Sequence, residues 1–318
     1  MRAVVIGAGI AGLVAARGLV NAGVDVLVIE RSRSVGGRMA TRRVGAATLD
    51  HGAQFFTTRT PAFRKQVGEW VERGLVRVWS HGFGTDDGYP RFVATAGMNS
   101  LAKDLAVGLE VECSTMAFAV RAGEGPPSAT TYPWQVVIDD GSTRAADAIV
   151  ITTPLPQAFA LLADTSVGLD DTLFRTDYDR TITMLAVLDH PGIVPNPGGV
   201  QEPDSTFSFI GDSMAKGVSA EPAITFHATA SWSEQHWSES KEQLLDSLES
   251  AAAPWLGDAT VVERQLKKWR FATPRTIWPD PYWATPDNTI ILAGDAFAGP
   301  RIEGAHNSGM AAAHSLTT

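Results

Sequence analysis

A glycine-rich turn between a strand-like run and a helical pattern constrains the fold of this chain more than any other feature. Residues 4–6 are β-branched and lead into the Gly-x-Gly-x-x-Gly sequence of residues 7–12, which opens a helical pattern up to Val20. A second predicted strand, residues 24–29, ends before Glu30. This succession of strand, glycine turn, helix, strand and acid is typical of the dinucleotide-binding unit of a doubly wound sheet, and it disfavours an ordinary βα turn.

Each glycine of this turn has its own predicted role. Gly7 permits the tight turn, Gly9 lets the backbone approach a pyrophosphate, and Gly12 lets the helix lie close on the strand. The helix N-terminus offers unpaired N–H groups and the positive end of its dipole to the phosphates. Glu30 is placed to accept hydrogen bonds from a ribose diol.

The C-terminal part of the chain carries a second signal of the same kind. The apolar run of residues 289–293 predicts a buried parallel strand that stops at Gly294 and Asp295. Gly294 allows close backbone approach, and Asp295 can hold a ribityl hydroxyl. Residues 300–309 begin the last helix, whose N-terminus would direct positive partial charge at a bound group. On a flavin, such charge favours the reduced state, because the N1–C2=O edge becomes negative on reduction.

Between these signals the sequence predicts a β-insertion. Residues 111–122, 134–139 and 146–152 have the composition of strands. A loose segment over residues 123–127 joins the first two, and a turn at residues 139–141 follows the second. We expect a meander that returns to the main sheet.

The stretch from Leu155 to about Pro286 differs in composition, because it holds six of the nine tryptophans. This density suits a second domain with an aromatic-walled pocket, and simple core and interface aromatics are the alternative for most of them. Residues 61–79 predict an amphipathic helix and the start of a strand. The helix face would consist of Phe63, Val67, Trp70 and Val71.

Composition and charge exclude several classes of protein. The 318 residues, 44% hydrophobic and 19% charged, are ordinary for a soluble globular protein of about two domains. A net charge of −9 argues against a general surface for nucleic acid or anionic membranes. The single cysteine, Cys113, excludes an internal disulfide and a Cys-rich metal site. The apolar run of residues 3–16 is too short to span a bilayer, so we expect a cytoplasmic protein.

Several blocks of sequence together point to a known family. They are residues 7–13, 36–39, 49–57, 97–98, 227–233, 269–274, 294–295 and 301–305. With these blocks the chain resembles the FAD oxidoreductases with two dinucleotide-binding motifs, the monoamine oxidase, protoporphyrinogen oxidase and phytoene desaturase superfamily. Within it, the chain is most similar to the bacterial renalase group. The resemblance spans nearly the whole chain.

The resemblance implies a two-dinucleotide-binding-type FAD domain of the α/β class, a doubly wound parallel sheet with a β-meander insertion, plus a smaller α+β substrate domain. The FAD domain is expected to comprise residues 1–60, 92–160 and 285–318, and the substrate domain residues 61–91 and 161–284. The implied cofactor is non-covalently bound FAD. No metal is expected, because the His and Asp residues show no metal-ligand spacing.

The implied activity is oxidation of isomeric dihydro-NAD(P), with the hydride at ring position 2 or 6, to NAD(P)⁺ with release of hydrogen peroxide. The partners would be this dinucleotide and molecular oxygen, with no nucleic acid and no membrane. An amine oxidase, or a dehydrogenase of the carotenoid or porphyrin type, is the alternative on the same fold, although the chain is short for either. A flavin-binding protein without turnover is the third reading.

The motifs and the resemblance together indicate the site residues. The cofactor-binding residues would be Gly7, Gly9, Ile10, Ala11, Gly12, Glu30, Arg31, Gly37, Arg38, Met39, Ala53, Gln54, Met116, Gly294, Asp295 and Ile302. The substrate-binding residues would be Gln54, Phe55, Phe56, Thr57, Thr58, Ala96, Gly97, Met98, His227, Trp232 and Arg301. Hydride transfer to flavin N5 needs orientation but no proton abstraction from carbon, so no catalytic base is assigned.

Three positions depart from the pattern of the bacterial relatives. His51 stands where an apolar residue is more usual, Pro300 where glycine is frequent, and His306 where an aromatic residue is usual. The alternation around His227 is compatible with a hydrogen-bonded histidine on a sheet face and with a pocket residue. Trp232 either walls the pocket or packs beneath it, and His306 either contacts the flavin edge or makes only local bonds.

Overall fold

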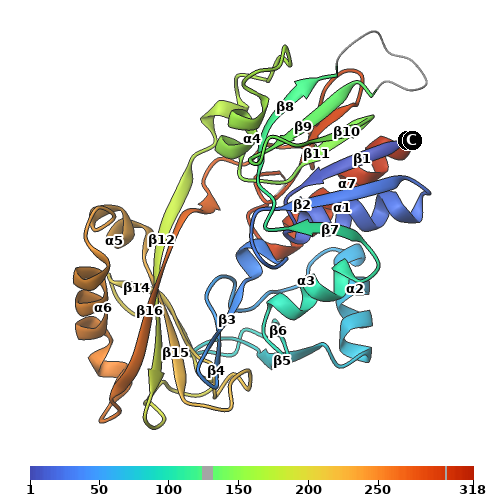
Figure 1. The fold of residues 1–318 in the computed structure, drawn as a ribbon. Coiled ribbons are helices and arrows are strands. Elements are labelled where there is room, and N and C mark those ends of the chain that lie inside the picture. Colours follow the sequence, from blue (N-terminus) through green and yellow to red (C-terminus); the bar gives the residue numbers. More distant parts are fainter. Residues whose placement is uncertain (124–131, 298) are drawn as a thin grey trace. The chain divides into compact units, whose positions relative to one another are not determined.

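The computed structural model describes residues 1–123, 132–297 and 299–318, and this part of the chain forms two compact units (Figure 1). The first unit comprises Met1–Gly37, Leu101–Asp177 and Pro274–Thr318, and the second comprises Arg38–Ser100 and Tyr178–Thr273. Both units are discontinuous in sequence. Their borders differ from those of the domains predicted above, and the functions assigned to those domains stay predictions.

The first unit is built on a six-stranded sheet, which confirms the predicted α/β fold. In spatial order its strands are β17 (Trp283–Ala284), β18 (Ile290–Leu292), β11 (Ala148–Ile151), β1 (Arg2–Ile6), β2 (Asp25–Glu30) and β7 (Glu110–Cys113). All neighbours run parallel except β17, which pairs antiparallel with β18. Strands β11 and β1 are almost wholly buried, as is typical of a parallel sheet covered on both faces.

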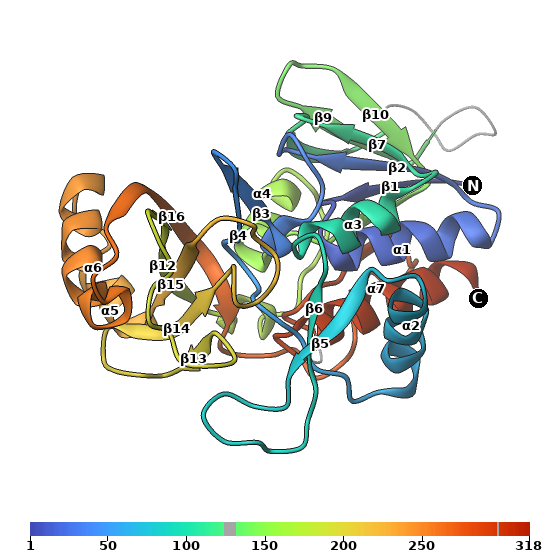
Figure 2. The same ribbon diagram turned by 90° about the horizontal axis from the view of Figure 1, so that it is seen from below.

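Two helices pack side by side against this sheet, as Figures 1 and 2 show. Helix α1 (Ile10–Asn21) follows β1, and α7 (Ile302–Thr317) ends the chain. They approach so closely that a Cβ on Gly309 would lie 2.2 Å from the carbonyl oxygen of Ala11. The remaining helical elements with residues in this unit are η1 (Gly37–Met39), α3 (Asn99–Ala106), α4 (Leu155–Leu162) and η2 (Leu173–Arg175).

A meander is present, but its first strand is shorter than expected and its third strand, β10, was not predicted, because the predicted strand of residues 146–152 is β11 of the main sheet. Strands β8 (Ala117–Ala122), β9 (Trp134–Ile138) and β10 (Thr143–Ala146) form an antiparallel sheet. The stretch of residues 111–122, predicted as one strand, is two strands in different sheets. The chain breaks at Ser114, whose φ of 56° is incompatible with a continuous strand. The turn at residues 139–141 is present, whereas most of the predicted loose segment, residues 124–127, lies outside the described residues.

The second unit is built on a five-stranded antiparallel sheet. Its order is β13 (Gly199–Gln201), β14 (Phe207–Asp212), β15 (Ala223–Ala228), β12 (Tyr178–Leu188) and β16 (Val261–Pro274). Helices α5 (Ala230–Gln235) and α6 (Lys241–Leu256) cover one face (Figure 1). The core beneath them includes Ile182, Met184, Phe226, Leu244 and Leu248. Because strand side chains alternate, Thr183 and His227 point to the opposite face.

A helix and two small antiparallel sheets complete the second unit. They are α2 (Pro61–Glu72), the pair β3 (Thr41–Val44) and β4 (Ala47–Asp50), and the pair β5 (Val76–Ser80) and β6 (Arg91–Ala94). Phe63, Val67 and Trp70 are buried on one face of α2, as predicted. The prediction for Val71 was wrong, since its side chain is 44% exposed. One residue after Trp70, it is turned about 100° around the helix axis.

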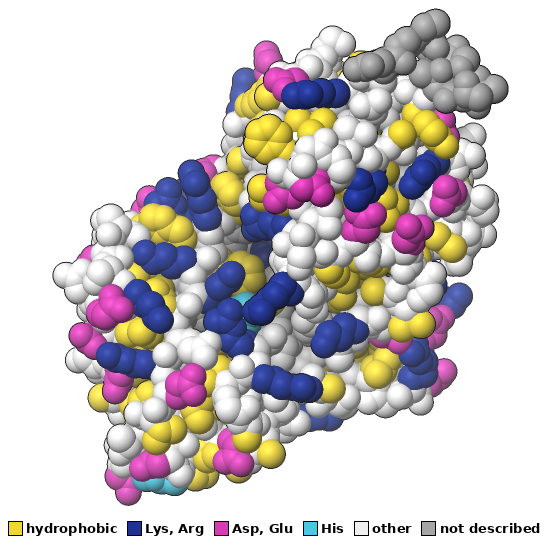
Figure 3. Space-filling view, viewed as in Figure 1, with side chains coloured by type: hydrophobic (Ala, Val, Ile, Leu, Met, Phe, Trp, Pro, Cys, Tyr) yellow, Lys and Arg dark blue, Asp and Glu magenta, His cyan; other side chains and the backbone are white. Residues whose placement is uncertain are grey.

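None of the described helices is long and apolar enough to cross a membrane. Acidic and basic side chains are spread over the face drawn in Figure 3.

Candidate functional site

The glycine turn after β1 has the geometry that its sequence predicts. Gly7 has a φ of +105°, which favours glycine. A Cβ on Gly12 would lie 1.9 Å from the carbonyl oxygen of Gly7, so only glycine lets α1 lie this close to the turn. At Gly9, which caps α1, a Cβ would meet no atom of the described residues within 4 Å. The protein's own packing therefore does not require glycine there, and the open space lies at a helix N-terminus, where amides can bind phosphate.

The Glu30 carboxylate is buried against this turn. One oxygen accepts from the N–H of Ala8 at 2.9 Å, and the other accepts from the N–H of Ser32 at 2.8 Å. Gly37 lies so close to the turn that its Cβ would be 3.4 Å from the Cα of Gly9. The first unit thus gathers the predicted cofactor residues of its N-terminal part around the start of α1. Glu30 also fixes the loop, a role that the sequence did not suggest.

The end of β18 and the start of α7 form a second close-packed glycine region in the first unit. Gly294, with a φ of +141°, donates its N–H to the hydroxyl of Ser308 at 2.8 Å. A Cβ on Gly304 would lie 2.2 Å from the carbonyl oxygen of Gly299. Arg301 caps α7 without a side-chain hydrogen bond to the helix, and its side chain is exposed. Backbone N–H groups at this helix start are therefore not capped by a side chain.

His306, in the first turns of α7, makes a local contact. Its Nδ1 lies 3.1 Å from the side-chain oxygen of Asn307. The ring is buried, and burial lowers the pKa of His306. The ring is therefore neutral at neutral pH, and a contact with the flavin edge stays a prediction.

In the second unit, the loop after β4 is fixed against Arg38. A Cβ on Gly52 would lie 2.0 Å from the carbonyl oxygen of Arg38, and Ala53 donates its N–H to the same oxygen at 2.9 Å. The guanidinium donates in turn to the carbonyl oxygens of Phe271 at 3.3 Å and Ala272 at 3.1 Å. These contacts orient the guanidinium, a group whose fork of N–H donors suits phosphate.

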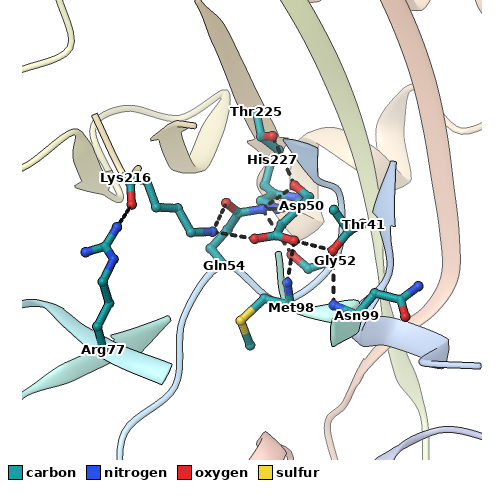
Figure 4. Close-up of polar contacts among 10 residues, drawn as sticks. All are labelled: Thr41, Asp50, Gly52, Gln54, Arg77, Met98, Asn99, Lys216, Thr225 and His227. Carbon is teal, nitrogen blue, oxygen red and sulfur yellow. Dashed lines mark hydrogen bonds and ion pairs between the residues drawn. The ribbon is translucent and has the colours of Figure 1, made fainter. Parts of the chain in front are cut away.

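A buried ion pair underlies this loop, and sequence reasoning missed one of its members. The Nζ of Lys216 lies 2.7 Å from Oδ2 of Asp50, and both side chains are at most 2% exposed (Figure 4). The other carboxylate oxygen accepts from the hydroxyl of Thr41 at 2.5 Å and from the N–H of Met98 at 2.8 Å. The buried carboxylate is thus both paired and hydrogen-bonded, as the desolvation of a charge requires.

Gln54 extends this network through both ends of its amide. Its Oε1 faces the Lys216 ammonium at 3.4 Å, and its Nε2 donates to the carbonyl oxygen of Asp50 at 2.6 Å. The ammonium can only donate, which agrees with this orientation of the amide. The same Nε2 lies 3.0 Å from Nε2 of His227 (Figure 4). The Gln54 side chain, predicted to contact cofactor and substrate, is therefore hydrogen-bonded within the second unit.

His227 is the end of this chain of contacts on the sheet. Its Nδ1 lies 2.8 Å from the hydroxyl of Thr183 on the neighbouring strand. Because the Gln54 amide nitrogen only donates, Nε2 of the neutral ring accepts and Nδ1 carries the proton. Burial lowers the pKa of His227 to about 4, against the opposite effect of the Gly52 carbonyl. His227 is thus a hydrogen-bonded histidine on a sheet face, and its contact with a substrate stays a prediction.

Phe55 and Phe56 have different surroundings. The half-buried Phe55 packs against Trp79, Phe83 and Phe209, with ring centroids 5.1 to 6.5 Å apart. Phe56 is buried and stacks on Phe92 at 5.7 Å. Of the two, Phe55 belongs to an aromatic cluster with partly exposed rings.

His51 packs on the other side of the loop, against β16. Its ring stacks on Trp269 with a centroid distance of 5.4 Å, and the Trp269 indole N–H donates to the His51 carbonyl oxygen at 2.7 Å. Burial, followed by the charges of Arg42 and Lys267, lowers the pKa of His51 to about 4. His51 is therefore a neutral, aromatic neighbour of two cations.

The remaining predicted substrate residues are partly dispersed. Gly97, with a φ of +88°, lies against Thr41, and Met98 is fully buried. Thr57 and Thr58 are half-buried, whereas Ala96 is exposed.

Trp232 lies in α5, stacks on His236 at 4.2 Å and packs against the core beneath the helices. The structure thus does not bring it together with His227, which points to the other face of the sheet. Among the other predicted cofactor residues, Arg31 and Met116 are exposed and Met39 is buried.

No group of His, Cys, Asp and Glu within the described ranges is placed to hold a metal ion. Four members of the buried network belong to no motif and were not indicated by the sequence: Thr41, Thr183, Lys216 and Thr225. Only the alternation of apolar and polar residues along β15 hinted that His227 points away from the core.

Comparisons with known proteins give the family and the fold. Residues 5–70 match the model of an NAD(P)-binding Rossmann-like domain, and residues 72–317 match that of flavin containing amine oxidoreductases.

Three solved structures share the fold over nearly the full length of both chains, each with 14% sequence identity. A candidate protoporphyrinogen oxidase from Exiguobacterium sp. 255-15 has a TM-score of 0.75 and covers 99% of this chain and 98% of its own. Putrescine oxidase bound to putrescine has a TM-score of 0.72 with 99% of each chain covered. An oxidoreductase from Methanosarcina mazei has a TM-score of 0.65, covering 98% of this chain and 99% of its own.

Proposed function

The chain belongs to the family of flavin containing amine oxidoreductases and is a flavin-dependent oxidoreductase, and from this premise we propose that it oxidises isomeric dihydro-NAD(P) with FAD and oxygen. The products are NAD(P)⁺ and hydrogen peroxide. The renalase-like motifs at residues 52–56 and 227–233 support this choice of donor within the family. The cytoplasmic location expected from the sequence stays a prediction.

The first unit fits the adenosine diphosphate half of FAD. The open space beside Gly9 admits a pyrophosphate at the start of α1, and the two loops that meet at Gly9 and Gly37 are close enough to enclose it. Glu30 lies beside this space with its carboxylate fixed by two backbone amides. The second glycine region, at Gly294 and the start of α7, would hold the ribityl and flavin end. When bound, FAD accepts a hydride and passes two electrons to oxygen.

One observation supports the choice of donor: the buried polar side chains of the second unit, which include the predicted substrate residues Gln54 and His227, are paired or hydrogen-bonded with one another. Asp50 is neutralised by Lys216, the Gln54 amide is engaged at both ends, and both nitrogens of neutral His227 are hydrogen-bonded. None of these groups is available as a base for an alkylammonium ion or as an anion to hold one. A dihydronicotinamide needs neither, because its hydride leaves without prior proton abstraction from carbon.

The chain's own residues then have to orient the donor. We assign the face of the nicotinamide ring to the aromatic cluster of Phe55, whose partly exposed rings provide flat apolar contact area. Arg301, exposed at the start of α7, is the second candidate contact. The buried network keeps the loop that carries Phe55 in one conformation.

The test is the anaerobic reduction of the bound flavin in a stopped-flow instrument. Isomeric dihydro-NAD should bleach the flavin at least about a hundredfold faster than β-NADH, since a misplacement of about 1 Å can change a rate by that factor. Benzylamine and putrescine should be slower still. Equal or faster bleaching by either amine would favour the amine oxidase, and no bleaching by any donor would favour a flavin-binding protein without turnover.

A further inference from the structure

The second unit carries a positively charged aromatic surface that the proposed function has not used. In Figure 3, Lys and Arg side chains gather over the part of the second unit that contains β3 and β16 in Figure 1. We define the β3–β16 surface by five side chains. These are Arg42, His51, Gln265, Lys267 and Trp269.

Strand alternation places three of these side chains on one face of β16. Gln265, Lys267 and Trp269 are each two residues apart and therefore project to the same side. Arg42 reaches from β3 to the side-chain oxygen of Gln265 at 2.9 Å, and the Lys267 ammonium lies 4.7 Å from the centroid of the Trp269 ring. Lys268 lies on the opposite face, where it donates to the carbonyl oxygen of Trp237 at 2.7 Å.

Two cations, Arg42 and Lys267, lie on this surface in a protein that is acidic overall, together with one carboxylate, that of Glu263, which accepts from the Gln265 amide at 3.0 Å. The net charge of the chain is −9, whereas the charges of Arg42 and Lys267 both add to the effect of burial in lowering the pKa of His51. The exposed Arg42 donates to an uncharged amide, that of Gln265. His51 is 6% exposed, and its Nδ1 has no hydrogen-bond partner among the described residues. A buried polar atom of this kind calls for a partner.

We propose that the β3–β16 surface binds the diphosphate of the dinucleotide donor. Arg42 and Lys267 supply two positive charges for two phosphate groups, and the Trp269 ring holds the Lys267 ammonium beside the stacked His51. The same charges repel an alkylammonium donor. This assignment rests on the proposed function, since it concerns the donor of that reaction.

The experiment compares two donors that differ only in the adenosine diphosphate half. Isomeric dihydro-NAD carries the diphosphate, and the corresponding dihydronicotinamide riboside does not. Arg42→Gln and Lys267→Gln should each raise the apparent Kd of the dinucleotide on the order of tenfold, as expected for the loss of a charge-assisted hydrogen bond. Reduction by the riboside should be unchanged. Lys268→Gln is the matched control and should leave the Kd of both donors unchanged.

The flavin content and the binding of ADP, measured by calorimetry, separate the possible failures. An equal loss with both donors, or a loss of flavin from Arg42→Gln and Lys267→Gln, would overturn the proposal, because the surface would then act on the fold or on the cofactor. If neither donor reduces the wild-type flavin, the proposed function fails. ADP binding then decides about the surface: weaker binding in both variants supports it, and unchanged binding refutes it.

Discussion

The buried pair of Asp50 and Lys216 makes the sharpest stability prediction. Asp50→Asn leaves an ammonium whose side chain is 2% exposed without its counter-charge at 2.7 Å. The new amide can still accept from Thr41 and Met98 through its oxygen, so the loss is dominated by the unpaired charge. Removing one partner of a buried pair costs about 3–5 kcal/mol, a large fraction of the roughly 5–15 kcal/mol that stabilise a typical domain.

The double variant Asp50→Asn/Lys216→Met distinguishes the charge effect from a simple loss of contacts. It removes both charges at once, so we expect it to be more stable than Asp50→Asn by about 2 kcal/mol or more. Lys216→Met alone leaves a buried carboxylate without its counter-charge, so it should also be destabilised by about 3–5 kcal/mol.

Urea unfolding, followed by tryptophan fluorescence and circular dichroism, measures these free energies of unfolding on the purified flavoprotein. The Lys216 ammonium lies 5.4 Å from the ring centroid of Trp79, which makes this tryptophan a local reporter. Single variants that each cost less than about 1 kcal/mol, or a double variant whose cost is the sum of the two, would refute the reasoning.

Three further predictions follow from the glycine turn, Glu30 and the buried histidines. Gly12→Ala should reduce the yield of folded protein, because its Cβ meets a backbone oxygen at 1.9 Å. Gly9→Ala should fold but bind flavin more weakly. Thermal melting and flavin content measure both effects, and equal behaviour of the two variants would contradict the prediction. Glu30→Ala should weaken FAD binding by about 1–3 kcal/mol without changing donor preference. An unchanged affinity in a flavin titration would contradict the assignment of Glu30 to the ribose diol. Because the folded-state pKa values of His51 and His227 are about 4, below the unfolded value near 6.5, the unfolded chain binds more protons between these limits. The free energy of unfolding should therefore rise by about 3 kcal/mol for each histidine between about pH 4 and pH 6.5, and then level off. Urea titrations at several pH values measure this rise, and His51→Leu should remove about half of it.

The sequence by itself determined the parts of the fold whose requirements are local. The turn at Gly7 needs a positive φ, and Gly12 needs the absence of a Cβ, so both can be recognised within a single strand–turn–helix unit. The same holds for β8 and β9 of the meander and for the strand before Gly294, since alternation and turn residues define them over a few residues. These local signals were sufficient for the α/β fold and, with the resemblance, for the flavin-dependent class.

Only the tertiary structure decided which polar side chains meet in the second unit. Lys216 is 166 residues from Asp50 and belongs to no motif, and His227 is 173 residues from Gln54. Their contacts depend on the register of β12 and β15 and on the packing of two distant loops, which no local pattern encodes. The same dependence separated Trp232 from His227, because a helix covers one face of the sheet while His227 points to the other. Burial then fixed the charge states of the histidines, because desolvation is set by the surrounding packing and not by neighbouring residues in the chain.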